Sequence, residues 1–376
     1  MKLYFLFILF ISIFIGIIYK LFYIEKEFTI LKLKDFINST VYPNSILVAE
    51  YQRYHLECLP GFTKYFIDLG YNVDIILYNN LSESMKKFRP LNRIRIFEYN
   101  SIKEIEKNLR QFKEKLKQYK FLFLETLEKH LIPFYEKVGY YNNPNSLFVI
   151  HHVDERYLLG INNSISKNRV FSLTDYGIIP YLNPNYYGNF KLSHEKNQIV
   201  SFFITSTKLR NYQYFIEGVS YLKNKSIDFI INVVGRCGNF TESNVPIELK
   251  KYFKFYGTVE YQKMYNIVKN SDFIILNLYP DNETDNLFRT FRATGNAQLA
   301  YGFYKPVLIE ENFVKVYKFS KETAIIYKGH NISSAMLIAA TMSKSQYKDM
   351  SRKVKYLKET IYNLSLNNLK KVLYGN

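Results

Sequence analysis

The sequence is poor in cysteine, with only Cys58 and Cys237 among its 376 residues. Two cysteines so far apart supply neither a disulfide framework nor the spacing of a metal site, and they are consistent with a reducing compartment. Familiar catalytic signatures are missing too. There is no Walker lysine motif, no G-x-S-x-G elbow, no H-E-x-x-H pair, and no G-x-G-x-x-G after the first expected strand. Because these motifs are missing, no enzyme class can be assigned to the chain from a single short motif.

Acidic residues are also scarce relative to basic ones, 33 against 51, which gives a formal charge of +18 and a pI near 9.4. Such a balance favours an anionic partner: nucleic acid, an acidic bilayer face or a phosphorylated substrate. The chain is rich in Lys, Asn, Ile, Tyr and Phe together, a bias that an AT-rich genome produces without selection for charge. Because the basic residues are dispersed and no nucleic-acid-binding module is recognised, nucleic acid is not an expected partner.

One long uncharged run stands at the N-terminus, from Leu3 to Tyr19. It predicts an uncleaved transmembrane anchor over residues 1–24, because a cleaved signal peptide would have a shorter apolar region ending in small residues. Lys2 precedes the run, whereas four lysines follow it within 15 residues, and this asymmetry predicts a single-pass membrane protein whose catalytic part is cytoplasmic.

Beyond this run, apolar strand-like segments alternate with helical periods, as in parallel α/β sheets. The near-continuous hydrophobicity of the strands predicts that both faces of each sheet are covered. We expect strands at 45–51, 72–78, 93–99, 120–127, 146–152 and 169–174 in the first half, and at 199–205, 227–235, 254–259, 271–280 and 306–310 in the second. A closing helix is expected over roughly 345–373.

The segment 177–192 contains two prolines, two glycines and several asparagines, which interrupt the patterns of both strands and helices. It is typical of an interdomain linker. The predicted organisation is therefore an N-terminal α/β domain over 40–176, this linker, and a C-terminal α/β domain over 193–376. The fold class is α/β, with two doubly wound domains behind a transmembrane helix.

Ligands of open parallel sheets bind beyond the carboxyl ends of the strands, where helix N-termini point their free N–H groups outward. Three joints of the second half are of this kind. The first offers Thr207, Lys208 and Arg210 before a helix, which suits a phosphate, although a solvated loop capped by an asparagine fits equally well. The second offers Gly235 and Arg236, where glycine lets the backbone approach a ligand.

A third joint has Arg289 and Arg292 just before the helix that begins near Gly295. Thr294 or Asn296 can cap this helix. Because cations at a helix N-terminus are unfavourable by about 0.3–1 kcal/mol each, two arginines there favour a bound anion such as a diphosphate. The alternative is that both arginines point to solvent.

The order of these elements resembles the C-terminal half of the two-domain GT-B glycosyltransferases, of the glycosyl transferase group 1 type. The resemblance is carried by VVGRCG, by FYGTVEYQKMYNIVKNSDFIIL and by QLAYGFYKPVLI. In the first half, CLPGFTKYFIDLGYNVDIIL resembles the first helix and second strand of these enzymes, and FVIHHVD resembles a strand whose end borders their cleft. The likeness spans about 45–372, and it lies in the order and spacing of degenerate motifs.

The resemblance implies two Rossmann-like domains facing a cleft, a nucleotide-sugar donor held by the C-terminal domain, and an acceptor held by the N-terminal one. It makes Lys208 and Arg210 donor diphosphate contacts. Many retaining members place two glutamates eight positions apart, but here Thr290 and Gln298 stand near those positions. Recognition of sugar hydroxyls must then differ, for instance through Glu283 or Asp285.

Transfer would need stabilisation of the leaving diphosphate, which cations and helix ends supply without a metal, and an inverting enzyme would need a base. The candidates are His151, His152 and Asp154 at the end of one strand, with His55 and Glu57 after the first. One of the adjacent histidines is expected to face the core.

The leading prediction is a membrane-anchored, metal-independent glycosyltransferase without a cofactor, acting on a lipid-linked or surface-glycan acceptor for polysaccharide synthesis. A sugar-nucleotide epimerase and a non-catalytic scaffold of the same fold remain the alternatives.

Overall fold

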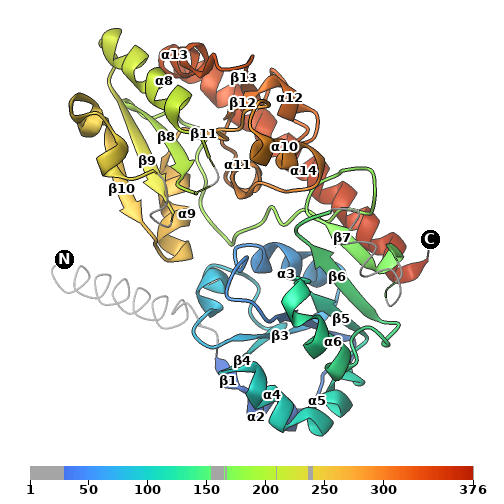
Figure 1. The fold of residues 1–376 in the computed structure, drawn as a ribbon. Helices are drawn as coiled ribbons and strands as arrows, with labels where there is room; N and C mark the ends of the chain where they lie inside the picture. Colours follow the sequence, from blue (N-terminus) through green and yellow to red (C-terminus); the bar gives the residue numbers. More distant parts are fainter. Residues whose placement is uncertain (1–28, 154–164, 166, 209, 236–239, 376) are drawn as a thin grey trace, which may run out of the picture.

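The computed structural model describes residues 29–153, 165, 167–208, 210–235 and 240–375. They form two α/β domains, each built on one parallel sheet, and Figure 1 shows the domains one above the other with the C-terminal domain at the top. The prediction of two doubly wound α/β units is therefore confirmed for this part of the chain.

The N-terminal sheet has the strand order β1-β4-β3-β2-β5-β6-β7, and all its pairs are parallel. Its strands are β1 (Ile30–Lys32), β2 (Ser45–Glu50), β3 (Asn72–Tyr78), β4 (Ile94–Tyr99), β5 (Phe121–Leu124), β6 (Ser146–Ile150) and β7 (Val170–Ser172). Its helices are α2 (Leu33–Asn38), α3 (Leu59–Asp68), α4 (Ile102–Lys107), α5 (Leu109–Leu116) and α6 (Ile132–Val138). Alternate residues of β2 enter different cores: Ile46 packs with one cluster and Leu47 with another, as both-sided covering requires.

The C-terminal sheet has the order β10-β9-β8-β11-β12-β13, again all parallel. Its strands are β8 (Val200–Thr205), β9 (Phe229–Val234), β10 (Phe253–Gly257), β11 (Phe273–Ile275), β12 (Val307–Glu310) and β13 (Ala324–Tyr327). The helices are α8 (Gln213–Asn224), α9 (Tyr261–Asn270), α10 (Glu283–Thr290), α11 (Gly295–Phe303), α12 (Glu311–Val314), α13 (Ile332–Thr341) and α14 (Lys344–Tyr374).

In each sheet the chain order reverses beside one strand, β2 in the first and β8 in the second. Crevices at such reversal points are where open α/β sheets bind ligands.

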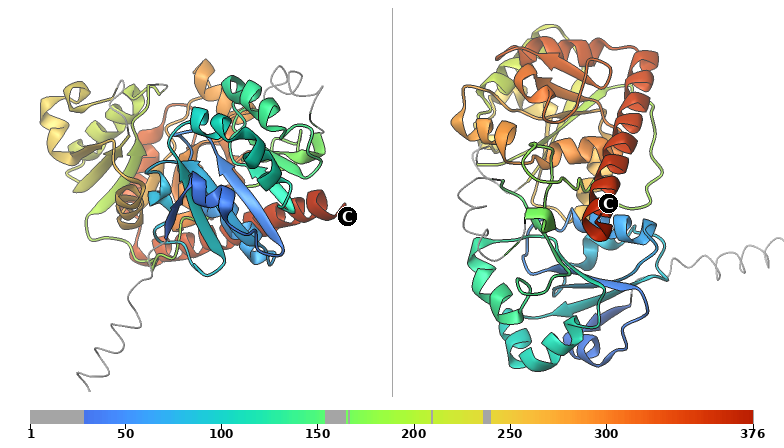
Figure 2. Two further views of the ribbon diagram at one scale, coloured as in Figure 1. Left: turned by 90° about the horizontal axis from the view of Figure 1, so that it is seen from below. Right: turned by 90° about the vertical axis from the view of Figure 1, so that its right-hand side faces the viewer.

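The closing helix α14 belongs to both domains. It starts against the C-terminal sheet, where Tyr347 Oη donates to the Asp272 carbonyl oxygen at 3.0 Å. Its later turns pack on the N-terminal domain, where the Tyr362 ring stacks on Tyr65 with centroids 4.5 Å apart and Leu369 is fully buried. Figure 2 shows this red helix running along both units. The predicted linker over 177–192 lies against it, because Asn183 N–H donates to Ser365 Oγ.

The sequence missed β1 and β13, and it overestimated the length of several strands, most of all the one expected at 271–280. The segment 271–280 is apolar throughout, yet the strand covers only Phe273–Ile275. Asn277 then takes φ of +50°, a left-handed conformation that ends the extended backbone.

The prediction of a single-pass membrane protein with a cytoplasmic catalytic part is corrected here. Within the part of the chain that the structure describes, no helix combines the length and the apolar character needed to cross a bilayer. The run on which the prediction rested, residues 1–24, lies outside the described residues.

Candidate active site

A pocket of about 260 Å³ lies between the two domains at the carboxyl ends of their strands. Its N-terminal wall comes from the loops after β2, β6 and β7, and its C-terminal wall from the segment that joins α10 to α11. The lining residues are His55, Glu57, Cys58, His151, His152, Leu173, Phe288, Arg292, Ala293, Gly295 and Gln298. Six of the predicted site residues, distant in sequence, therefore meet at one place.

The N-terminal wall carries an imidazole pair. The rings of His55 and His151 lie 4.0 Å apart, tilted by 31°. His55 Nδ1 is 3.7 Å from Glu57 Oε1, and the His55 backbone has φ of +68°. A non-glycine residue held in the left-handed region costs about 1 kcal/mol or more, and such strain gathers at functional sites.

The two imidazoles have pKa values displaced in opposite directions. Burial lowers the pKa of His55, but its hydrogen bond and charge interaction with Glu57 outweigh burial and raise the pKa above the usual value. Burial, with the nearby charge of His55, holds the pKa of His151 well below the usual value. A proton is therefore held by His55 in preference to His151, a division typical of acid and base groups.

Two buried carboxyl groups stand behind this wall, Glu50 at the end of β2 and Glu125 after β5. Burial raises the pKa of Glu50 to about 8, although its hydrogen bond from Thr126 opposes the shift. Burial, followed by the charges of Glu50 and Glu57, raises the pKa of Glu125 well above its usual range. Sequence analysis missed both residues. An acidic side chain at the end of an apolar strand was the available signal.

His152 connects the two domains. Its Nδ1 accepts a hydrogen bond from Arg292 Nε at 2.8 Å, and the two residues form an antiparallel bridge. Beside them, Val153 N–H donates to the Phe291 carbonyl oxygen at 2.9 Å. Because Arg292 Nε can only donate, His152 Nδ1 is the lone-pair nitrogen. This histidine therefore orients the arginine.

The C-terminal wall contains the start of α11. Thr294 is its N-cap residue but makes no side-chain capping bond, and Gly295 opens the helix toward the pocket. Gln298, one turn in, is 3% exposed, and among the described residues its Nε2 has no hydrogen-bond partner. Asn296 has a structural contact instead, since its Nδ2 donates to the Ile275 carbonyl oxygen at 3.0 Å.

The two predicted arginines separate. Arg292 lines the pocket, whereas Arg289 is exposed in the last turn of α10 and is not among the lining residues. A cation at a helix C-terminus is favourable, so α10 itself accounts for Arg289. The sequence did not predict helix α10 before α11. Because Arg289 lies in the last turn of α10, it is held away from the start of α11.

Arg210 is already paired within the protein. It forms an ion pair with Asp285 of α10, and its guanidinium lies 4.1 Å from the Phe288 ring centroid. Asp285 also accepts the Tyr279 N–H at 3.1 Å. Arg210 and Asp285 thus hold α10, and through Phe288 they support the pocket wall from behind.

The other predicted donor contacts lie near this joint. Thr207 N–H donates to Tyr212 Oη at 2.9 Å, and Lys208 is exposed. A Cβ added to Gly235, at φ of +136°, would come within 2.5 Å of the Ser206 carbonyl oxygen. The glycine is therefore required for the close approach of two loops. Arg236 and Asp154 lie outside the described residues.

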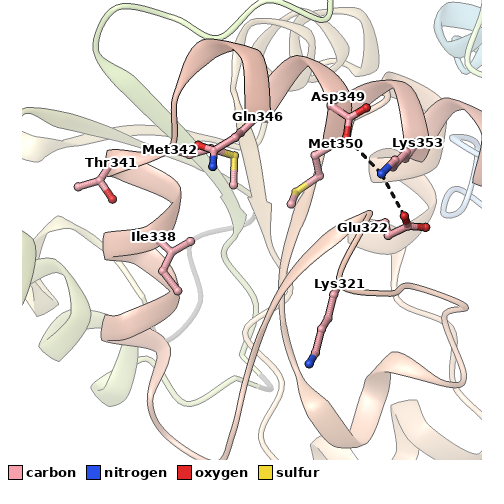
Figure 3. Close-up of a pocket in the computed structure, with 9 residues that line it drawn as sticks. All are labelled: Lys321, Glu322, Ile338, Thr341, Met342, Gln346, Asp349, Met350 and Lys353. Atoms are coloured by element: carbon pink, nitrogen blue, oxygen red, sulfur yellow. Dashed lines mark hydrogen bonds and ion pairs between the residues drawn. The ribbon is translucent and has the colours of Figure 1, made fainter.

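A second hollow, of about 440 Å³, lies on the C-terminal domain between α13, α14 and the turn before β13 (Figure 3). Ile338, Met342 and Met350 line it together with charged residues such as Lys321 and Lys353. None of the predicted site residues lines it, so the interdomain pocket is the better candidate.

Comparisons with known proteins support the fold. No family model and no curated protein matches the chain. Among solved structures, TarM is 10% identical with a TM-score of 0.57, covering 89% of this chain and 99% of that one. AviGT4, a glycosyltransferase involved in avilamycin A biosynthesis, is 10% identical with a TM-score of 0.53 and the same coverage. At these identities the likeness establishes the fold, and the expected two-domain GT-B architecture is confirmed at that level.

Proposed function

We propose that this protein is a glycosyltransferase that moves a sugar from a nucleotide-sugar donor to a hydroxyl group of an acceptor in the interdomain pocket. One observation carries the proposal: a helix N-terminus with an arginine faces a wall of imidazole and carboxylate groups across a single pocket. The fold shared with AviGT4, a glycosyltransferase of avilamycin A biosynthesis, is consistent with it.

The C-terminal wall has the groups that a leaving diphosphate needs. Arg292 supplies a fixed cation, α11 supplies the positive end of its dipole at Gly295, and Gln298 supplies an unpaired N–H donor. Preorganised donors of this kind stabilise the negative charge that grows as the bond to the sugar breaks. The contacts expected from Lys208, Arg210, Gly235 and Arg236 stay predictions.

The N-terminal wall would hold the acceptor. His55, Glu57 and His151 offer hydrogen-bonding groups and a proton acceptor within the same pocket. A lipid-linked or surface-glycan precursor stays the predicted acceptor class. A metal-independent reaction stays a prediction.

The arginines provide a test with a matched control. Arg292→Ala removes a charge-assisted contact to the diphosphate, so we expect nucleoside diphosphate affinity to fall by about 10- to 100-fold, or about 1.4–3 kcal/mol. Arg289→Ala removes an exposed arginine three residues away and should leave affinity unchanged. Isothermal titration with UDP, GDP and dTDP measures both, and equal losses in the two variants would contradict the assignment.

Activity is tested by incubating the protein with a panel of nucleotide sugars and measuring nucleoside diphosphate release and the sugar products. Transfer to an acceptor supports the proposal. Interconversion of the nucleotide sugar without release would indicate an epimerase. The absence of any stabilisation by nucleotides, where a ligand at 100 times its dissociation constant adds about 2.7 kcal/mol, would indicate a scaffold.

A further inference from the structure

We propose that Thr126 and Glu50 are positioning residues of this pocket, which fix the tautomer of His151 so that its Nδ1 lone pair receives the proton of the acceptor hydroxyl. The reaction that this serves rests on the proposed function. The tautomer is a property of the protein alone and can be measured without any substrate.

The inner edge of the His151 ring determines which nitrogen carries the proton. Its Nε2 lies 3.4 Å from the backbone carbonyl oxygen of Glu125 and 3.3 Å from Thr126 Oγ1. A carbonyl oxygen can only accept a hydrogen bond, so this contact favours Nε2 as the donor, but at 3.4 Å it is too long to fix the tautomer alone. In a neutral imidazole the other nitrogen, Nδ1, then holds the lone pair.

Thr126 reinforces this tautomer through Glu50. The Thr126 hydroxyl donates to Glu50 Oε2, and Glu50 Oε1 accepts the Gln52 N–H. A hydroxyl that gives its hydrogen to a carboxylate presents only lone pairs to a second neighbour, here His151 Nε2. Glu50 is fully buried and its pKa is about 8, so this reinforcement grows as the pH rises through that range.

Nδ1 is the ring nitrogen that is left for a ligand. His151 lines the pocket, and Nδ1 takes no hydrogen bond from the part of the chain that the structure describes. The adjacent His152 cannot serve in the same way, because its Nδ1 lone pair is occupied by Arg292. The two neighbouring histidines therefore have different tasks.

The surroundings keep His151 neutral and ready to accept. The charged and titratable groups around it are His55 and Glu57 from the loop after β2, Glu50 at the end of β2, Glu125 and Glu128 after β5, and His152 with Arg292 at the domain contact. Glu128 acts on His55 and Glu50 by its charge. Burial and the cationic His55 oppose protonation of His151 before the acceptor arrives.

The step balances as a single displacement. The acceptor oxygen forms a bond to the anomeric carbon, and the bond from that carbon to the diphosphate oxygen breaks with its electron pair leaving on the diphosphate. The hydroxyl proton moves to His151 Nδ1, and the resulting imidazolium later loses it to water. Positioned proton acceptors of this kind contribute typically 10²- to 10⁴-fold to a rate.

The decisive measurement is nitrogen NMR of the full chain labelled at histidine nitrogen, with His151 assigned through His151→Gln. We expect a single Nε2–H tautomer in the unmodified protein and a mixture in Thr126→Val. Thr126→Ser should restore the single tautomer. Thr63→Val is the matched control, because Thr63 is a fully buried threonine of the same domain whose Oγ1 has no partner among the described residues. An Nδ1–H tautomer in the unmodified protein would overturn the inference, whether or not any variant folds.

Kinetics provide a second readout. Thr126→Val should lower kcat roughly 10-fold, with KM for the donor unchanged, and Thr63→Val should not. Glu50→Gln removes the carboxylate that orients the Thr126 hydroxyl, so it should produce a tautomer mixture like that of Thr126→Val. A kcat loss in Thr126→Val no larger than in Thr63→Val would refute the positioning role. If the unmodified protein transfers no sugar at all, the proposed function fails, and the NMR result alone decides the tautomer.

Discussion

Glu50 offers a stability experiment whose size follows from its burial. The folded protein holds its pKa at about 8 against 4.5 for an exposed glutamate, so ionisation is opposed in the folded state. Below pH 4.5 the group is protonated in both the folded and the unfolded chain, and no cost arises. As the pH rises toward 8, the unfolded chain ionises first, and the free energy of unfolding falls by about 1.4 kcal/mol per pH unit. Above pH 8 the full cost is about 5 kcal/mol.

Glu50→Gln removes this titration while keeping an amide of the same shape. The free energy of unfolding of the variant, compared with the unmodified protein, should therefore rise steadily between pH 5 and pH 8 and then level off. Urea denaturation followed by far-ultraviolet circular dichroism measures it, with hydrogen exchange of β2 and β5 to report on the N-terminal domain alone.

Glu57 supplies the control because its pKa is shifted the other way. Burial raises the pKa of Glu57, but the hydrogen bond and charge of His55 outweigh it and bring the pKa below the usual value. That stabilisation is present above pH 4.5 and is lost in acid. Glu57→Gln should therefore lose stability at neutral pH and match the unmodified protein in acid. A difference for Glu50→Gln that stays constant from pH 5 to pH 9 would refute the reasoning.

Two further variants test the C-terminal wall. Gln298→Glu places a carboxylate where a donor faces the pocket, so nucleoside diphosphate affinity should fall about 10-fold at pH 8 and less in acid. Titration calorimetry measures this affinity. Unchanged affinity would mean that the diphosphate binds elsewhere. The Arg210 side chain is 7% exposed, and Asp285→Asn leaves it without its counter-ion. The free energy of unfolding in urea should therefore fall by about 3–5 kcal/mol. The double variant with Arg210→Met should recover much of that loss. A double variant as unstable as the single one would show that the pair is not the cause.

The sequence predicted most strands because burial on both faces leaves a direct trace in composition. A segment such as 45–51 is apolar at nearly every position, and each residue from Ser45 to Glu50 is buried. The short edge strand β1 has no such trace. Of the three residues of β1, Ile30 and Lys32 are exposed, and this strand was missed.

The candidate site was only partly predictable, for a different physical reason. His55 and His151 stand out as residue types after strands, and Arg292 stands out as a cation before a helix; all three line the pocket. Glu50 and Glu125 did not stand out, because their importance comes from burial beside one another and from neighbours up to 76 positions away. Arg289 stood out as well, but it lies in the last turn of α10 and is not among the lining residues of the pocket.

By itself the sequence determined the local structure: where apolar runs become strands, where the linker interrupts them, and which charged residues follow each strand. Only the tertiary structure decided which of those residues share one pocket, which nitrogens of His151 and His152 are hydrogen-bonded within the protein, and which arginine is paired. Strand and helix formation depend on neighbours along the chain. Hydrogen-bond roles and shifted pKa values depend on neighbours in space, which the packing of two domains brings together.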